Sequence, residues 1–494
     1  WLAGGAVMCA LMASSQSFTA YTTIESEIWS VGKTSLKGRP AGELLVEVQG
    51  DETGVVFHAW GTTFNELDWD AYNLLTRDEQ DEIMHNLYAP DGDLRFTHGR
   101  VSMNANDYAR SWYSCSEVSG DFELRHFNIE RDKRNIIPLV RAAQKYCPEL
   151  QLFMSPWSPP TWMKINQDYP VLSSKYNNQD PRQDYVLYMD DGKAVDPDEM
   201  KLLGARGGVF PHRLALQDYF IQDPRYLQCY ADMFCRFIEL YAEQGLPITK
   251  VMYQNEAYSY TPYPGCAWTA EGTLRFNNEY LAPTLAAKHP EVELWIGTFN
   301  TNRLDYVQKI LDDSTLQKNI KGVGTQWECR YNLPELRKRY PNLRFMQSES
   351  ECGNGSMDWR AGEHTFMLIA DNLGNGCDEY YNWNFILQDN GSSSWGWTQN
   401  ALIQVNSATR EMRYTPEYYA YKHFSHFVAK GTEMVGYSGR QHADTPVVVF
   451  KNENGYIVAA GNFADDATTV CVKIGDKYLN MRLPAHSFNT FVER

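Results

Sequence analysis

Short runs of apolar and β-branched residues recur along the chain, and each is followed by a polar loop and a segment with helical spacing of its apolar positions. The expected strands cover residues 54–64, 95–104, 150–160, 249–256, 292–300, 321–328, 343–350 and 377–387. Between them, 132–147 and 225–243 carry apolar side chains at the spacing of an amphipathic helix. Eight strand-then-helix units predict a (β/α)8 TIM barrel over residues 54–430.

An open, doubly wound α/β sheet also alternates strands with helices, so it is the alternative fold. That fold commonly carries a glycine-rich nucleotide loop after its first strand, and no such loop follows the first expected strand here. The pattern therefore favours the barrel.

The pattern changes after about residue 430, where two stretches of alternating residues are each interrupted by a short turn. Asn-Glu-Asn-Gly in "FKNENGYIV" and Gly-Asp in "KIGDKYL" are turn sequences, which indicate hairpins. We expect residues 431–494 to form a smaller β-sandwich. Residues 21–53 contain strand-like runs such as "ELLVEV" and are expected to join the same sandwich.

The first 20 residues, "WLAGGAVMCALMASSQSFTA", resemble the apolar part of a secretory signal followed by small residues near a cleavage site. This interpretation predicts a secreted or periplasmic protein. The apolar run is too short to cross a membrane, so stable membrane insertion is not expected. A buried first strand or helix is the alternative interpretation.

Residues 167–215 form a polar, Tyr-rich stretch without clear periodicity, which is long for a connection in a compact fold. Because it follows the third expected strand, it is expected on the catalytic face of the barrel. It either shapes a substrate cleft or is a loop without a function of its own.

The amino-acid composition indicates which kinds of molecule the protein is expected to bind. The 494 residues carry a formal charge of -17, and no cluster of Lys and Arg interrupts it, which argues against a nucleic-acid partner. The chain has 31 Tyr and 14 Trp, which suit either core packing or stacking against sugar rings. The ten Cys show neither a CxxC pair nor metal-like spacing with His, and their disulfide pairing cannot be deduced from spacing.

Two Glu residues are expected at the carboxyl ends of barrel strands, where TIM-barrel enzymes carry their chemistry. Glu256 closes the fourth expected strand and Glu349 closes the seventh. Opposed carboxyl groups about 5–5.5 Å apart are what retaining glycoside hydrolysis requires, with one acting as nucleophile and the other as proton donor. Asn255, directly before Glu256, is placed to hydrogen-bond a sugar 2-hydroxyl, although an ordinary loop-opening Asn would look the same.

Four motifs together resemble glycoside hydrolase family 30, which includes glucosylceramidases. They are "SPWSPPTWMKIN" (155–166), "QNEAYSYTPYPGCAWTAEG" (254–272), "FMQSESECGNG" (345–355) and "YYNWNF" (380–385). The resemblance implies a retaining mechanism with Glu256 as acid/base and Glu349 as nucleophile. Glu351 competes for the nucleophile's role because alternation in a strand would place it on the same side as Glu349.

The same resemblance implies a set of substrate-binding residues: Arg100, Asp107, Trp157, Asn255, Gln326, Trp327 and Trp383. Among them, Asp107 would accept hydrogen bonds from sugar hydroxyls, and Arg100 would orient the nucleophile through a charge-assisted hydrogen bond. Core packing is the alternative role for Trp157 and Trp383, and also for Trp162.

The chain departs from the family pattern at the end of the sixth strand. Glucosylceramidases carry His-Trp-Tyr there, whereas this chain has Gln326-Trp327-Glu328. A Gln replaces the hydrogen bond of a His but cannot carry its charge, which argues against assuming a ceramide glycoside as substrate.

These observations predict a β-glycoside hydrolase that acts on β-glucosides or β-1,6-glucan, with a carbohydrate as its partner. Other specificities of the family, such as β-xylosidase or β-fucosidase, are alternatives, and so is a carbohydrate-binding barrel without catalysis. The mechanism requires neither a metal nor an organic cofactor. The oligomeric state is not readable from the sequence.

Overall fold

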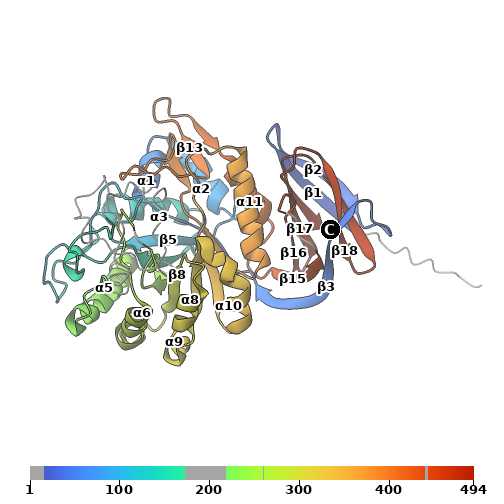
Figure 1. Ribbon diagram of the computed structural model, residues 1–494. Helices are drawn as coiled ribbons and strands as arrows, with labels where there is room; N and C mark the ends of the chain where they lie inside the picture. Colours follow the sequence, from blue (N-terminus) through green and yellow to red (C-terminus); the bar gives the residue numbers. More distant parts are fainter. Residues whose placement is uncertain (1–15, 173–217, 260, 440–442) are drawn as a thin grey trace, which may run out of the picture. The chain divides into compact units, whose positions relative to one another are not determined.

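The computed structural model describes residues 16–172, 218–259, 261–439 and 443–494 (Figure 1). The chain divides into two compact units. One is Gly54–Met434, and the other combines Trp1–Thr53 with Val435–Arg494.

The unit Gly54–Met434 contains a closed barrel of eight parallel strands, which confirms the predicted (β/α)8 fold. Neighbours in the barrel are neighbours in the sequence, and the last strand pairs with the first. The strands are β4 (Ala59–Thr63), β5 (His98–Met103), β6 (Gln151–Pro156), β7 (Ile248–Met252), β8 (Glu293–Phe299), β9 (Gly322–Gln326), β10 (Arg344–Glu349) and β11 (Glu379–Asn382).

The expected strands are generally longer than those in the structure, and several of their end residues belong to loops or to other elements. The stretch 54–64 is divided at residues 57–58 between β4 and the end of the longer strand β3 (Glu43–Val56). The stretch 377–387 is interrupted at residues 383–385, between β11 and β12 (Ile386–Gln388). The predicted end of the fourth expected strand is wrong. Strand β7 (Ile248–Met252) stops four residues earlier, and Glu256 lies in the loop that follows it.

Large side chains fill the interior of the barrel. Phe153, Met252, Trp295, Met346 and Tyr381 come from five different strands and form one buried cluster. Small residues on adjacent strands make room for them. A Cβ atom at Gly322 would lie 2.4 Å from the Trp295 ring, and one at Gly61 would lie 2.6 Å from the Tyr381 ring. Pairing large with small side chains lets the narrow barrel reach the packing density of a protein interior.

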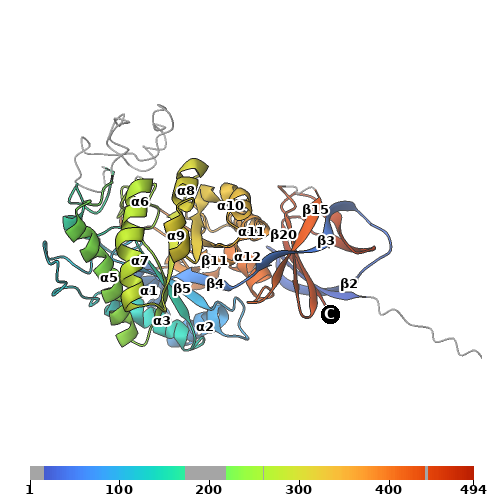
Figure 2. The ribbon, with the colours of Figure 1, turned by 90° about the horizontal axis from the view of Figure 1, so that it is seen from below.

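Helices lie outside the barrel strands (Figures 1 and 2). The predicted amphipathic segments become α3 (Ile136–Gln144) and α5 (Pro224–Glu243). Helix α5 begins where it does because the Asp223 side chain accepts a hydrogen bond from the Arg225 amide, and Pro224 suits the first helical turn. The other α-helices in the described part of the chain are α1 (Glu66–Tyr72), α2 (Arg77–Tyr88), α6 (Ala270–Phe276), α7 (Ala282–Lys288), α8 (Leu304–Leu311), α9 (Ser314–Asn319), α10 (Leu333–Arg339), α11 (Trp359–Gly374) and α12 (Pro416–Ser425).

A largely buried network of charges lies at the amino-terminal end of the barrel. Lys250 Nζ donates to both carboxylate oxygens of Glu379, at 2.5 and 2.7 Å, and both side chains are buried. Arg344 adds a second cation at 2.5 Å from Glu379. A buried charge is costly unless it is paired, so the pairing in this network matters for the stability of the fold. The network lies at the end of the barrel opposite the strand termini that carry the candidate site.

The second unit is a single nine-stranded sheet in the order β19-β18-β3-β15-β16-β17-β20-β1-β2. Its strands besides β3 are β1 (Ser17–Ile24), β2 (Glu27–Ser35), β15 (Glu433–Gly439), β16 (Val447–Asn452), β17 (Gly455–Asn462), β18 (Thr468–Ile474), β19 (Lys477–Leu483) and β20 (Ser487–Glu493). The two predicted hairpins are the pairs β16–β17 and β18–β19.

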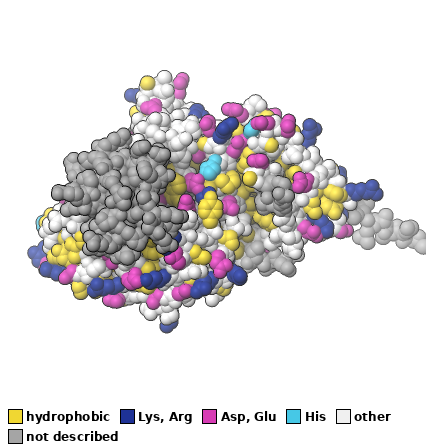
Figure 3. Space-filling model, viewed as in Figure 1, with side chains coloured by type: hydrophobic (Ala, Val, Ile, Leu, Met, Phe, Trp, Pro, Cys, Tyr) yellow, Lys and Arg dark blue, Asp and Glu magenta, His cyan; other side chains and the backbone are white. Residues whose placement is uncertain are grey.

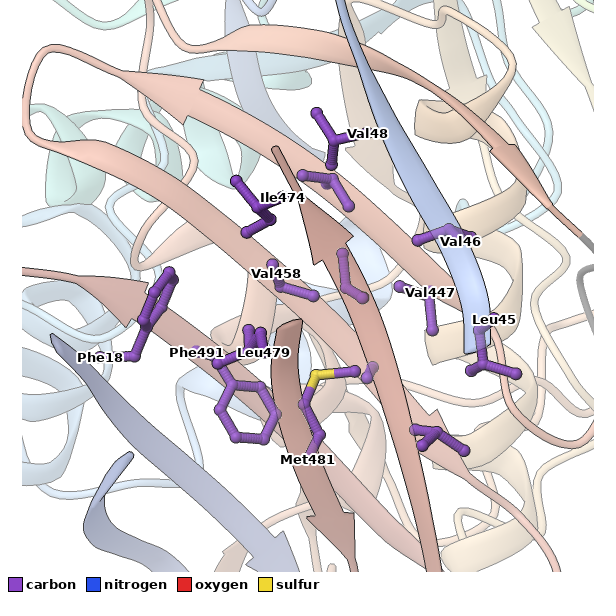
Figure 4. Close-up of a cluster of buried hydrophobic side chains, with 14 of the residues drawn as sticks. Phe18, Leu45, Val46, Val48, Val447, Val458, Ile474, Leu479, Met481 and Phe491 are labelled. Atoms are coloured by element: carbon purple, nitrogen blue, oxygen red, sulfur yellow. The ribbon is translucent and has the colours of Figure 1, made fainter. Parts of the chain in front are cut away.

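One core unites this sheet. Phe18 of β1, Leu45 of β3, Leu479 of β19 and Phe491 of β20 belong to the same buried cluster, although their strands are far apart in the hydrogen-bonding order (Figure 4). The sheet therefore curves over onto itself. The layers expected of a β-sandwich are present, but they are joined by continuous strand pairing rather than forming two separate sheets.

The expected leader and the long stretch 167–215 both lie partly outside the described residues. Of the expected leader, residues 1–15 lie outside the described residues, whereas Ser17 to Ala20 are part of β1 and Phe18 is buried. Of the long stretch 167–215, residues 173–215 lie outside them as well. In the described part of the chain, no helix combines the length and apolar character needed to cross a bilayer.

Basic and acidic side chains are interspersed over the described surface on the face shown in Figure 3.

Candidate active site

The sequence-predicted site residues gather at the carboxyl-terminal ends of the barrel strands. Arg100 lies within β5, and Gln326 and Glu349 are the last residues of β9 and β10. The others follow a strand directly or lie in the loop after it: Asp107, Trp157, Asn255, Glu256, Trp327 and Trp383. The contacts described below connect these side chains into one cluster.

Arg100 is the centre of the cluster. Its guanidinium is fully buried, and Nη1 lies 2.8 Å from Glu349 Oε2. Nη2 donates to Asn255 Oδ1 at 2.7 Å and to Ser155 Oγ at 3.0 Å. The guanidinium carbon also lies 4.3 Å from the centre of the Trp157 ring, which gives a cation–π contact. A planar group with several donors can hold two acceptors and an aromatic face at once, which a lysine cannot do.

Asn255 has one orientation imposed on it by three donors. Besides Arg100, Thr298 Oγ1 and Gln326 Nε2 donate to its Oδ1, each at 3.0 Å. With Oδ1 occupied in this way, the amide nitrogen of Asn255 is the end left for a ligand. The predicted contact with a sugar hydroxyl is compatible with this geometry.

Glu349 is buried against donors from strands β5 and β9 and from Trp327, the residue that follows β9. In addition to Arg100, Gln326 Nε2 donates to its Oε2 at 3.2 Å, and Trp327 also hydrogen-bonds its carboxylate. Burial raises the pKa of Glu349, whereas the Arg100 charge and these hydrogen bonds oppose that rise. The pKa of Glu349 therefore stays above its usual value, but the donors limit the rise that burial alone would cause and stabilise the ionised form.

Glu256 is in a different environment from Glu349. Burial, followed by the negative charges of Glu349 and Asp107, raises the pKa of Glu256 to about 8. Its backbone has φ 49°, a left-handed conformation that is uncommon for a side chain of this size. The Glu256 amide donates to Thr298 Oγ1 at 3.0 Å, which ties this conformation to the end of β8. Backbone strain of this kind is concentrated at functional sites.

Glu351, the competitor for the role of nucleophile, is committed to another set of partners. Its Oε2 lies 2.8 Å from His364 Nε2, and its Oε1 accepts a hydrogen bond from Arg330. Burial acts to raise the pKa of Glu351, but His364 and Arg330 outweigh that effect and lower it. The structure thus separates two Glu residues that the sequence leaves two positions apart.

Aromatic rings form one wall of the cluster. The Trp157 and Trp383 rings are stacked with centroids 5.2 Å apart, and both belong to a buried group with Tyr108, Cys352 and others. Trp162, by contrast, donates from its indole nitrogen to the Ser116 carbonyl at 2.9 Å. Its ring packs against Phe122 and Tyr226, so it is a structural side chain.

Three buried polar atoms of the cluster lack a hydrogen-bond partner among the described residues. They are Asp107 Oδ1, Gln326 Oε1 and the Trp383 indole nitrogen. Burial, and then the negative charge of Glu349, raises the pKa of Asp107 well above its usual value. Because buried polar groups are normally satisfied, these unsatisfied atoms indicate that the cluster binds a polar ligand.

Some members of the cluster were not predicted from the sequence. Ser155 accepts a hydrogen bond from Arg100, and Thr298 donates one to Asn255. Ser259 donates one to Glu256. Thr298 lies in the fifth expected strand, so its position near a strand end was the available signal. No sequence pattern indicated Ser259, because the conformation of the loop after β7 brings its hydroxyl to Glu256.

The described residues contain no group of three or more His, Cys, Asp or Glu side chains arranged to hold a metal ion. What the cluster does contain is a carboxylate paired with a buried guanidinium, and beside it a carboxyl group that remains protonated near neutral pH. Such a pair can supply a nucleophile and a proton at one place.

Comparisons with known proteins agree with this chemistry. The sequence model of the glycosyl hydrolase family 30 TIM-barrel domain matches residues 57–189 and 220–428. The lysosomal acid glucosylceramidase of Mus musculus is 23% identical over 438 residues, which cover 83% of this chain and 76% of that protein. The endo-1,6-beta-D-glucanase neg1 of Aspergillus fumigatus is 22% identical over 479 residues, which cover 92% and 89%.

A solved structure has the same fold. SrfJ from Salmonella typhimurium superposes with a TM-score of 0.80 at 19% sequence identity, and the match covers 97% of this chain and 99% of SrfJ.

Proposed function

The chain belongs to glycosyl hydrolase family 30 and is an O-glycosyl hydrolase, and from that premise we propose that it is a retaining β-glycosidase for β-glucosides or β-1,6-glucan. In this proposal Glu349 is the nucleophile and Glu256 is the acid/base. The observation that carries the assignment is the contrast between the two carboxyl groups: Glu349 is paired with a buried Arg100, whereas Glu256 is held protonated.

The first step forms a glycosyl-enzyme. The Glu349 carboxylate attacks the anomeric carbon while Glu256 transfers its proton to the glycosidic oxygen, and the bond to the leaving group breaks. Once Glu349 is esterified, its negative charge no longer raises the pKa of Glu256. Glu256 then ionises more readily and acts as the base that deprotonates the attacking water.

Arg100 and Asn255 support both carboxyl groups. Arg100 restricts Glu349 to one orientation and keeps it ionised until it attacks. Asn255, held by its Oδ1, directs its amide nitrogen toward the substrate, where a hydrogen bond to the 2-hydroxyl strengthens in the transition state.

The choice of glucosides rests on the relatives. Their names identify a glucosylceramidase and an endo-1,6-β-D-glucanase, and both names refer to a glucose-containing substrate. The glucanase match extends over more of both chains. Gln326, which stands where glucosylceramidases have His, favours a glycan over a ceramide glycoside because it cannot carry the charge of that His.

A substrate panel tests the proposal. We expect hydrolysis of β-1,6-glucan and of 4-nitrophenyl β-glucoside, with a first-formed product of β configuration in a proton NMR time course. The variants Glu256→Gln and Glu349→Gln should lose this activity. A first-formed α product, or hydrolysis by both variants at the parent rate, would contradict the mechanism, and a preference for xylosides or fucosides would correct the substrate class.

Export from the cytoplasm is also part of the proposal, supported by the leader-like composition of the residues that precede β1, since Ser17–Ala20 belong to that strand. Recovery of the protein from the extracellular or periplasmic fraction of the cells that produce it tests this point.

A further inference from the structure

A short relay of hydrogen bonds leads to the carboxyl group of Glu256 from outside the predicted site. Ser259 Oγ donates to Glu256 Oε2 at 3.2 Å. Asn300 Nδ2 in turn donates to Ser259 Oγ. Ser259 and Glu256 are both buried, so water competes little for these contacts.

The direction of the relay follows from the chemistry of its members. An amide nitrogen donates and does not accept, so Asn300 occupies a lone pair of the Ser259 oxygen. The hydroxyl proton of Ser259 is then free to point at Glu256. The loop supports the same geometry, because the Ser259 amide also donates to the Glu256 carbonyl at 2.9 Å.

The charged and titratable groups around Glu256 determine how much the Ser259 hydroxyl affects the ionisation of Glu256. Glu349 and Cys352 face Glu256 from the β10 side, and Arg100 and Asp107 face it from the β5 side. Glu349 and Asp107 disfavour ionisation of Glu256, and Arg100 opposes them mainly by its charge at a distance. The Ser259 hydroxyl is a direct hydrogen-bond donor to the carboxyl group itself.

We propose that Ser259, held by Asn300, is a positioning residue for Glu256 that fixes its Oε2 and stabilises the carboxylate left after proton transfer. With Oε2 held, the proton leaves from the other oxygen. It passes to the glycosidic oxygen as the bond from that oxygen to the anomeric carbon breaks and the bond to Glu349 forms. This inference rests on the proposed acid/base role of Glu256.

A hydrogen bond to a carboxylate strengthens as the negative charge develops, so its loss is felt when the acid gives up its proton. Substrates with poor leaving groups need that proton, whereas 2,4-dinitrophenyl glycosides depart without it. Removing the hydroxyl should therefore lower kcat/KM about tenfold for an alkyl or oligosaccharide glycoside and by less than about twofold for the dinitrophenyl glycoside.

The experiment compares Ser259→Ala, Ser259→Thr and Asn300→Ala with the parent. Expected results are a selective loss for poor leaving groups in Ser259→Ala, a smaller selective loss in Asn300→Ala, and recovery in Ser259→Thr, which retains a hydroxyl. The basic limb of the kcat/KM–pH profile should also move to higher pH in Ser259→Ala, because the ionised form of Glu256 has lost a donor. Ser487→Ala is the matched control, since Ser487 is a buried, hydrogen-bonded serine of the other unit.

Equal losses on both kinds of substrate, or an unmoved basic limb, would overturn the proposal. If Ser259→Ala does not fold, the test rests on Asn300→Ala. The proposal is overturned if that variant has the same leaving-group dependence and the same pH profile as the parent. Failure of the proposed function is distinguishable, because Glu256→Ala itself would then show no selective loss for poor leaving groups.

Discussion

The guanidinium of Arg100 lies 2.8 Å from the carboxylate of Glu349, and both side chains are buried. A buried ion pair of this kind contributes little to stability relative to an apolar pair of the same shape, because each charge loses its hydration. Its value is orientation. The same guanidinium also holds Asn255, so the residue beside Glu256 and the carboxylate of Glu349 are aligned by one side chain.

Replacement of Arg100 by lysine tests this alignment. Lysine retains a positive charge but cannot reach Glu349 and Asn255 together, so we expect kcat/KM to fall about 10²–10³-fold, comparable to the loss of one transition-state donor. Arg339→Lys is the control, since Arg339 pairs with Asp312 at the surface. Parent-like activity of Arg100→Lys would show that charge alone suffices.

Azide distinguishes the roles of the two carboxyl groups. Glu349→Gly should be rescued by azide to give an α-glycosyl azide, because azide takes the place of the nucleophile. Glu256→Ala should give the β-anomer, because azide then attacks the glycosyl-enzyme. The products are identified by NMR. Exchanged anomers would exchange the two roles.

The pH dependence should report the protonation of Glu256. A pKa of about 8 means that the acid is protonated below that pH, so kcat/KM should fall as the pH rises through about 8. In Glu349→Gln the negative charge that raises this pKa is gone, and the pKa of Glu256, measured by carbon NMR of labelled Glu, should be lower than in the parent. An unchanged value would mean that the two groups do not interact.

Glu351→Gln should differ sharply from Glu349→Gln. Glu351 is paired with Arg330 and His364, so its neutral replacement is expected to reduce kcat/KM by less than about tenfold, whereas Glu349→Gln should reduce it by at least about 10³-fold. Measurement of both variants on one aryl glucoside is sufficient. A larger loss for Glu351→Gln would reverse the assignment of the nucleophile.

The charge network at the amino-terminal end of the barrel should control stability. Lys250→Met leaves Glu379 with one buried cation fewer and is expected to cost about 3–5 kcal/mol of unfolding free energy in urea. Lys288→Met, which breaks the more exposed pair with Asp232, should cost less than about 1 kcal/mol. Equal costs for the two variants would argue against a structural role of the network.

The same network predicts an acid limit to stability. Although burial opposes it, the charge of Lys250, with His98 and Arg344, lowers the pKa of Glu379 from 4.5 to about 2. A carboxylate whose pKa is lowered in the folded state contributes stability that is complete above its unfolded pKa. That stability is lost as the pH falls from about 4.5 toward 2. Urea unfolding of the parent and of Lys250→Met across this range should show a smaller acid loss in the variant.

Much of the architecture was predictable from the sequence by itself. The eight strands and the intervening helices follow from the period of apolar positions, because a strand buried on both faces and an amphipathic helix have local signatures. The hairpins β16–β17 and β18–β19 follow from local turn residues. Local pattern places Glu256 and Glu349 at the ends of expected strands, whereas their choice as catalytic residues rests on the resemblance of the surrounding motifs to the family.

Other features were decided only by the tertiary structure. The interruption at Trp383 and the end of β7 at Met252 depend on what the neighbouring strands pair with, which no local pattern contains. Glu349 and Glu351 each follow a Ser, and the sequence favours Glu349 because it closes the expected strand. The positions of Arg100 and Arg330 show that the two carboxylates have different partners. Contacts between residues far apart in the chain set the protonation of each carboxyl group, because electrostatic energy depends on distance in space and on burial.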